Sequence, residues 1–206
     1  MWAIGITGGV GCGKSEILRY LQEEYGCRVI LTDECAKEME RKGGALYEPV
    51  CRLLTEHGGT HFLGEDGEID KPAMAAMIFS DSLLLEEINA LVHPVVNAYV
   101  KGEVERERER GALEFLILES ALMIENNYRS FLDEMWYIYC DEEERRRRLA
   151  LTRGYSQEKI TGIMSRQIPE TAFREACDVT IDNSGALQDT LARIDAQIRR
   201  LRAHEI

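Results

Sequence analysis

The chain has 206 residues, of which 45% are hydrophobic and 30% are charged, a composition typical of a globular protein of one or two domains. Its formal net charge of −12 argues against a nucleic-acid or acidic-membrane partner, because both would repel it. No apolar run has the length of a membrane span, and the chain starts directly in a predicted strand, so we expect a cytoplasmic protein.

A glycine-rich turn follows the first predicted strand. The stretch from Trp2 to Ser15 reads W-A-I-G-I-T-G-G-V-G-C-G-K-S and matches the pattern G-x-x-x-x-G-K-[ST], in the strand, loop and helix context of a phosphate-binding loop. Glycines let the backbone come close to a ligand. The helix predicted from Lys14 adds unpaired N–H groups and the positive end of its dipole. An ordinary glycine-rich turn is the alternative, and its position after an N-terminal strand disfavours it.

This loop predicts a site for ATP and Mg²⁺. We expect Lys14 to reach the outer phosphates as a catalytic residue and the Ser15 hydroxyl to ligate Mg²⁺. The ATP-binding residues expected from the loop are Gly9, Val10, Gly11, Cys12, Gly13, Lys14 and Ser15.

The next elements alternate between helix and strand. An amphipathic helix ends at Gly26, and Val29 to Leu31 reads as a short buried strand. Asp33 follows at the carboxyl end of this strand, where ligands gather in open α/β sheets.

From Glu34 to about Arg110 the pattern is helical. It is interrupted at Gly43-Gly44 and over the turn-rich run 58–67. Pro72 suits the first turn of a helix, Ser82 is a predicted cap of the next one, and Pro94 is expected to kink or end that helix. Alternating Glu and Arg residues from 103 to 110 predict a solvated, salt-bridged helix end.

Three more strands follow. Phe115 to Leu118 delivers Glu119 to a strand end, and Met135 to Cys140 is followed by a helix from Asp141. Ser156 is the expected cap of a second helix that runs toward Gln167. Val179 to Ile181 is the last strand, before a final amphipathic helix. Strands that alternate with helices predict an α/β fold with a parallel sheet of about five strands and helices on both faces.

Several segments, from Ile6 to Gly185, together resemble the dephospho-CoA kinase family. T-G-G-V-G-C-G-K-S is close to that family's opening motif, and Asp33 matches the second aspartate of its D-A-D motif. D-G-E-I-D-K at 66–71 and L-E-E-I-N-A-L-V-H-P at 85–94 resemble two further blocks. E-S-A-L-M-I-E at 119–125 stands where the family has D-x-P-L-L-x-E. The other matching residues are Arg148-Leu149, Arg153, Gln167, Asp178 and I-D-N-S-G at 181–185.

The resemblance implies a P-loop NTPase fold and the last step of coenzyme A synthesis. In that reaction the γ-phosphoryl of ATP passes to the ribose 3′-hydroxyl of dephospho-CoA, giving CoA and ADP. It implies a single kinase domain made of a core at about 1–32, 111–140 and 170–206, a helical insertion for the acceptor at about 33–110, and a helical lid at about 141–169. We expect a monomer or a weak homo-oligomer.

The resemblance also implies roles for individual residues. Asp33 accepts or orients the attacking hydroxyl, and Glu119 holds a Mg²⁺-bound water. Arg148, a catalytic residue, and Arg153 bind ATP from a mobile lid, while Asn183 and Gly185 border the adenine. Arg145, Arg146 and Arg147 are expected to form a solvated helix face.

The six cysteines are scattered, without a C-x-x-C pair, which argues against a zinc site or a disulfide framework. Cys12 carries a separate hypothesis, because it lies in the loop near a helix start and Lys14. Its oxidation or alkylation would block ATP, and ATP would protect it. The plainer interpretation is a small residue that fits the loop.

Two alternatives stay open from the residues alone. One is another small-molecule P-loop kinase, acting on a nucleoside monophosphate or a sugar acid, which the order of the later blocks disfavours. The other is a nucleotide-dependent switch, which predicts an N-K-x-D motif that the chain lacks.

Overall fold

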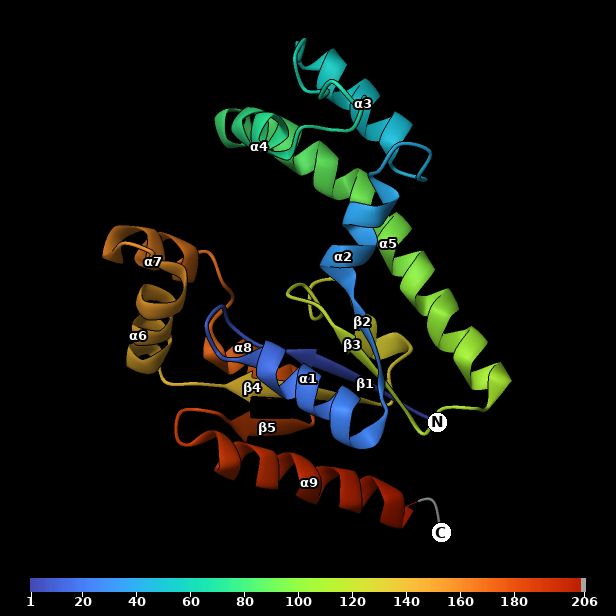
Figure 1. The fold of residues 1–206 in the computed structure, drawn as a ribbon, viewed down its shortest axis with the longest axis vertical. Helices are drawn as coiled ribbons and strands as arrows, with labels where there is room; N and C mark the ends of the chain where they lie inside the picture. The colour runs from blue at the N-terminus through green and yellow to red at the C-terminus, as the bar shows by residue number, and fades with distance from the viewer. Residues whose placement is uncertain (205–206) are drawn as a thin grey trace. The chain divides into compact units, whose positions relative to one another are not determined.

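The structure, a computed structural model, describes residues 1–204. The chain divides into two compact units, one made of Met1–Ile30 with the chain from Val104 onward, and the other of Leu31–Glu103 (Figure 1). Among the described residues, no helix combines the length and the apolar character needed to cross a bilayer.

A five-stranded sheet with the order β2-β3-β1-β4-β5 forms the centre of the first unit, within the described residues. The pairs β1–β3, β1–β4 and β4–β5 are parallel. The strands are β1 (Trp2–Thr7), β2 (Arg28–Leu31), β3 (Phe115–Glu119), β4 (Glu134–Tyr139) and β5 (Val179–Asp182). The predicted α/β fold with about five parallel strands is confirmed.

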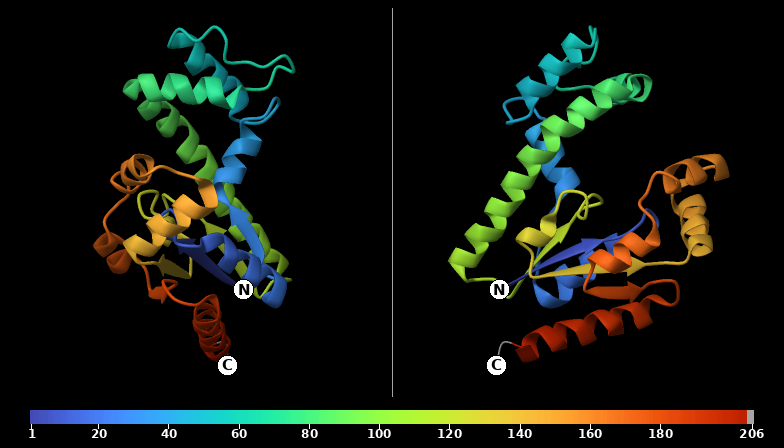
Figure 2. Two further views of the ribbon diagram at one scale, coloured as in Figure 1. Left: turned by 60° about the vertical axis from the view of Figure 1, so that its left-hand side comes forward. Right: turned by 180° about the vertical axis from the view of Figure 1, so that it is seen from behind.

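Helices cover both faces of this sheet. Tyr20 of α1 (Lys14–Tyr25) donates a hydrogen bond to Asp195 of α9 (Leu187–His204), so these helices lie together, and Arg200 of α9 binds Glu134 of β4. On the opposite face, Phe173 of α8 (Glu170–Ala176) stacks on Tyr137 with ring centroids 4.8 Å apart. Figure 1 shows α1 in front of the sheet, and the view from behind in Figure 2 brings α8 forward.

Successive side chains of β1 point to opposite faces of the sheet, and both faces are closely packed. In β1 the side chains of Ile4 and Ile6 are fully buried. On the other face, a Cβ added at Gly5 would lie 2.5 Å from the sulfur of Met123, so the segment between β3 and β4 packs closely there. That segment includes a short 3-10 helix, η1 (Tyr128–Ser130). The remaining helices of this unit are α6 (Glu142–Arg153) and α7 (Gln157–Met164).

The second unit is helical. It contains α2 (Thr32–Met39), α3 (Tyr47–Glu56), α4 (Lys71–Ser80) and most of α5 (Ser82–Arg110). His57 joins two of its helical segments, because its Nδ1 lies 2.7 Å from Asp81 Oδ2 and its Nε2 lies 2.8 Å from Glu87 Oε2. These hydrogen bonds, with Asp81 and then Glu87, raise the pKa of His57 above its usual value. By contrast α4 has no buried residue, and Phe79 near its end is 84% exposed.

Most predicted helix boundaries are confirmed. Gly26 ends α1 in the left-handed conformation, Pro72 lies in the first turn of α4, and Ser156 caps α7. The predicted cap Ser82 is wrong: Asp81 accepts hydrogen bonds from the N–H groups of Leu83 and Leu84 instead.

Three other expectations need correction. Pro94 does not end its helix, because α5 continues to Arg110 and a proline removes only one backbone donor from a helix that long; the alternative expectation, a kink at Pro94, stays a prediction. The acidic and basic run at the end of α5 is not wholly solvated, since Glu107 is 4% exposed and binds Arg28 and Arg110. The short helix α8 was not predicted at all.

Candidate active site

The glycine-rich loop connects β1 to α1 and is closely packed. Gly13, the residue before α1, has φ of 86°, and Gly11 has φ of 80°, a left-handed conformation that disfavours other residues. A Cβ at Gly13 would lie 2.4 Å from Asn183 Nδ2. Glycine is therefore required at position 13 both by backbone conformation and by a neighbouring side chain.

Lys14 is held in place by two oxygen atoms. Its Nζ donates a hydrogen bond of 2.8 Å to the carbonyl oxygen of Gly8 and lies 3.5 Å from Glu119 Oε1. Both side chains are largely buried, with 15% of Lys14 and 17% of Glu119 exposed. Parallel register pairs Ile6 of β1 with Glu119 of β3, so the two strand ends bring the ammonium and the carboxylate to the same edge of the sheet.

The donors at this edge suit Mg²⁺. Ser15 is an exposed hydroxyl in the first turn of α1, and Glu119 supplies a carboxylate. Over the described part of the chain, no cluster of three or more His, Cys, Asp or Glu side chains is arranged to hold a metal. Mg²⁺ is commonly bound by few protein oxygens together with substrate phosphates and water, and the residues present fit that mode of binding.

Asn183 braces the loop from β5. Its side chain is 3% exposed, donates from Nδ2 to the carbonyl oxygen of Cys12 at 2.8 Å, and accepts at Oδ1 from the Thr190 hydroxyl at 2.8 Å. Both polar atoms of the Asn183 side chain, Nδ2 and Oδ1, are therefore already bound to protein groups. Buried amides left without partners are costly, so this network fixes the position of Cys12.

Arg148 of α6 joins the same network. Its Nη2 donates to the carbonyl oxygen of Asn183 at 2.9 Å, and its Nε donates to Glu144 Oε1 at 2.8 Å. Glu144 also accepts two hydrogen bonds from Arg147. The contacts with Arg147, and then those with Arg148, lower the pKa of Glu144 to about 2, so its carboxylate is ionised when it orients Arg148.

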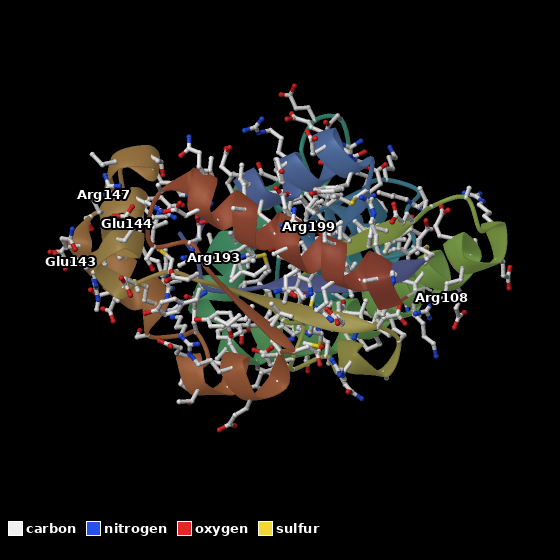
Figure 3. The ribbon with its side chains drawn as sticks, turned by 90° about the horizontal axis from the view of Figure 1, so that it is seen from below. Arg108, Glu143, Glu144, Arg147, Arg193 and Arg199 are labelled. Carbon is white, nitrogen blue, oxygen red and sulfur yellow. The ribbon has the colours of Figure 1, made fainter. Side chains whose placement is uncertain are left out.

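Arg145 lies against the loop, and its expected place on a solvated face is wrong. Its Nε donates to the carbonyl oxygen of Val10 at 2.9 Å, and its Nη2 donates to Gln167 Oε1 at 2.5 Å. The same Gln167 oxygen accepts the N–H of Val10 at 3.3 Å. In contrast, Arg147 is exposed and lies beside Glu144 on the outer side of α6 (Figure 3).

The other predicted site residues are placed as follows. Arg153 is the exposed last residue of α6, and Gly185 is exposed in the turn after β5. Within the described residues, no hydrogen bond joins either of them to the loop. Asp33 is exposed in the first turn of α2, in the second unit. Cys12 is 1% exposed, so a reagent reaches its thiol only when the loop moves.

Sequence reasoning missed two braces of the loop, Arg145 and Thr190. Arg145 stands in a run of four arginines, and nothing in that run distinguishes it. Thr190 lies one helical turn into α9, and its partner Asn183 comes from the preceding strand end. Only the packing of α9 on the sheet identifies this pair.

Known proteins are similar to this chain over nearly its whole length. Residues 2–189 match the model of the dephospho-CoA kinase family. A dephospho-CoA kinase of Streptococcus mutans is 36% identical over 200 residues, which cover 96% of each chain. A crystal structure from Thermus thermophilus superposes with a TM-score of 0.77 at 29% identity, covering 97% of both chains. A dephospho-CoA kinase from Campylobacter jejuni, at 16% identity and a TM-score of 0.75, covers 99% of this chain and 98% of its own and shares the fold.

A parallel sheet whose first strand runs through a glycine-rich G-K-S loop into a helix defines a P-loop NTPase. The match of the family model over nearly the full chain is more specific. The chain belongs to the dephospho-CoA kinase family, whose members are ATP-dependent kinases.

Proposed function

We propose that the loop from Gly8 to Ser15 holds the phosphates of Mg-ATP while the γ-phosphoryl passes to the ribose 3′-hydroxyl of dephospho-CoA, giving CoA and ADP. The observation that carries this proposal is the position of Lys14, whose ammonium is fixed at the loop by Gly8 and Glu119. An ammonium already fixed there neutralises phosphate charge with little reorganisation, and such preorganised charge is a major source of catalysis.

Mg²⁺ is the proposed cofactor, with the Ser15 hydroxyl as a direct ligand and Glu119 as the partner of a bound water. When bound, the ion neutralises charge on the outer phosphates. Glu119 then has two roles, because the same carboxylate contacts Lys14. It orients the ammonium in this structure, and it would hold a water of the bound ion in the complex.

Asp33 is the proposed base. It lies in the first turn after β2 with an exposed carboxylate, and an acidic side chain there suits the task of accepting or orienting the proton of a ribose hydroxyl. Its other role, support of the α2 N-terminus, is compatible with this one, because the first turn of a helix favours a negative charge.

Arg148 is proposed to stabilise the charge of the transferring phosphoryl group. Its guanidinium is permanently charged and offers several donors, and Glu144 and Asn183 orient it. Arg153 is proposed to reach ATP from the exposed end of α6. The backbone at Asn183 and Gly185 is proposed to border the adenine, since the Asn183 amide already has protein partners.

We further propose that the chain works in the cytoplasm, without nucleic acid or membrane, as a monomer or weak homo-oligomer. Its core at about 1–32, 111–140 and 170–206 would bind ATP, the insertion at about 33–110 would hold dephospho-CoA, and the segment at about 141–169 would act as a lid.

A transfer assay tests the reaction. Purified protein is incubated with Mg-ATP and, in parallel, with dephospho-CoA, AMP, gluconate or no acceptor. We expect equal amounts of ADP and CoA with dephospho-CoA only. Phosphorylation of AMP or gluconate in its place would identify another small-molecule kinase, and release of phosphate without any acceptor would point to a nucleotide-dependent switch.

A further inference from the structure

We propose that Arg145 is a positioning residue for phosphoryl transfer. With Gln167 it forms a clamp on the peptide of Val10, at the apex of the phosphate-binding loop. The inference rests on the proposed function of the loop as the ATP site and assigns to this clamp the task of fixing the loop apex.

The contacts form a closed triangle. Arg145 Nε binds the carbonyl oxygen of Val10 at 2.9 Å, Arg145 Nη2 binds Gln167 Oε1 at 2.5 Å, and Gln167 Oε1 accepts the Val10 N–H at 3.3 Å. Both polar groups at Val10, its N–H and its carbonyl oxygen, are therefore bound by two side chains that also bind each other. Val10 lies between Gly9 and Gly11, where the backbone has little intrinsic rigidity.

The clamp joins both ends of the predicted lid to the loop. Arg145 lies near the start of α6, and Gln167 lies after α7 and before α8. Arg148, one turn further along α6, contacts Asn183, which in turn holds Cys12. The loop is thus held at Val10 by Arg145 and at Cys12 by Asn183. Because Arg145 lies on α6 and Asn183 is bound by Arg148 of the same helix, the position of α6 is coupled to the position of the loop N–H groups proposed to bind phosphate.

The guanidinium of Arg145 is required for this geometry in a way that a lysine does not reproduce. Its planar fork places two donors on two different acceptors at once, whereas an ammonium on a flexible stem is a single point charge. Loss of the clamp leaves the backbone donors of the loop and Lys14 in place. We therefore expect ATP to bind with modestly reduced affinity. The chemical step should slow by about 10- to 100-fold, the effect expected when the reacting phosphate is misplaced by about 1 Å.

Gly9 offers a second way to displace the guanidinium. A Cβ at Gly9 would lie 2.4 Å from Arg145 Nη2, the far end of a flexible side chain, and Gly9 does not have a positive φ. Gly9→Ala is thus expected to push Arg145 aside without unfolding the protein. If that is how it acts, the same change in an Arg145→Ala background does not speed exchange of the Val10 amide any further.

The experiment compares Arg145→Ala, Arg145→Lys, Gln167→Ala, Gly9→Ala and the double variant Gly9→Ala/Arg145→Ala. An Arg199→Ala variant is the control, because Arg199 is an exposed arginine of α9 (Figure 3). Thermal unfolding confirms that each variant is folded. Single-turnover transfer to dephospho-CoA, the Kd for Mg-ATP and hydrogen exchange of the Val10 amide are then measured.

The clamp predicts that Arg145→Lys is as slow as Arg145→Ala, that Gln167→Ala speeds exchange at Val10, and that the Val10 amide exchanges no faster in the double variant than in Arg145→Ala. Full activity of Arg145→Lys, unchanged kcat in Arg145→Ala, or an equal gain in Val10 exchange from Gly9→Ala in both backgrounds would overturn it. If the wild type transfers nothing to dephospho-CoA, the proposed function fails. The clamp is then judged separately by Val10 exchange and by the Kd for Mg-ATP.

Discussion

The phosphate-binding loop and the helical unit Leu31–Glu103 differ in how their polar and apolar groups are used. Around the loop, Lys14, Arg145 and Asn183 all bind backbone oxygens at 2.8 to 2.9 Å. In the helical unit, α4 has no buried residue and Phe79 is 84% exposed. Protein side chains already hold the backbone of the loop in position, whereas α4 of the helical unit leaves apolar side chains exposed.

This difference suits two unlike ligands. Phosphate is recognised by fixed donors, and donors that are already in position lose no free energy to reorganisation when charge develops. A large flexible acceptor offers apolar as well as polar surface, and an exposed apolar patch on a protein is commonly a binding surface. Changes to the loop region should therefore affect the chemistry, and most changes to the helical unit should affect acceptor binding or local stability. Asp33 is the proposed exception.

Asp33→Asn is expected to have the largest effect. Loss of a general base lowers turnover by about 10² to 10⁴-fold, while Mg-ATP should bind as before because Lys14 and the backbone of the phosphate loop are unchanged. Steady-state kinetics and a nucleotide-binding titration measure both quantities. Glu34→Gln, which changes the exposed neighbour, is the control. Unchanged turnover in Asp33→Asn would remove the base from this position.

Lys14→Ala is expected to reduce kcat by about 10² to 10³-fold, the typical effect of removing one charge-stabilising donor. It also leaves Glu119 without its ammonium partner, so ATP binding should weaken. Kinetics with saturating dephospho-CoA give kcat and the KM for ATP. A variant that keeps wild-type kcat would place the reacting phosphate elsewhere.

Arg148→Ala at saturating ATP is expected to lower kcat by roughly 10²-fold, again as the loss of one donor to a developing charge. Arg153→Ala, at the exposed end of the same helix, should have a smaller effect and serves for comparison. The opposite ranking of the two variants would contradict the orientation of Arg148 by Glu144 and Asn183.

Asn183→Ala is expected to destabilise the first unit by about 1 to 3 kcal/mol, because the buried carbonyl oxygen of Cys12 loses its partner and the Thr190 hydroxyl keeps only its longer bond to Asp182. Urea unfolding measures the change in the free energy of unfolding. Gln188→Ala, at an exposed position of α9, is the control. If both substitutions cost the same, the network with Cys12 and Thr190 contributes nothing.

The smallest effect concerns pH and the helical unit alone. His57 has a raised pKa and Asp81 a lowered one, chiefly through their mutual hydrogen bond. Protonated His57 stabilises the folded unit fully below its unfolded pKa, and this stabilisation is lost as pH rises through its folded pKa. Ionised Asp81 stabilises the folded unit above its unfolded pKa, and this stabilisation is lost as pH falls through its folded pKa. After division by the intrinsic exchange rate at each pH, the protection of amides in α3 and α4 should thus be greatest at mildly acidic pH. Asp81→Asn should weaken this dependence and leave the smaller effect of Glu87. An unchanged profile in that variant would contradict it.

The sequence predicts the loop well because its constraints are local. Gly13 and Lys14 are fixed by the backbone and by a phosphate-binding pattern within a few residues, and the structure places both at the β1–α1 turn. Arg145 was predicted wrongly because its partners Val10 and Gln167 are distant in the chain. A run of arginines after glutamates satisfies the rule for a solvated helix equally well.

Helix boundaries and long-range ion pairs in the rest of the chain show the same contrast between local and distant constraints. Caps such as Ser156 and turns such as Pro72 depend on neighbours in sequence and are confirmed. The burial of Glu107 depends on Arg28, which is 79 positions away. A bond between residues so far apart leaves no periodic signal in either segment.

In the proposed reaction the loop at Gly8 to Ser15 delivers the terminal phosphoryl of ATP to a ribose hydroxyl. A rapid-quench experiment with γ-labelled ATP, Mg²⁺ and dephospho-CoA tests it directly when the wild type and Lys14→Ala are compared. We expect label at the ribose 3′-position of CoA within one turnover of the wild type and a slowing of about 10² to 10³-fold in the variant. Label found only in inorganic phosphate, or equal rates for both proteins, would contradict it.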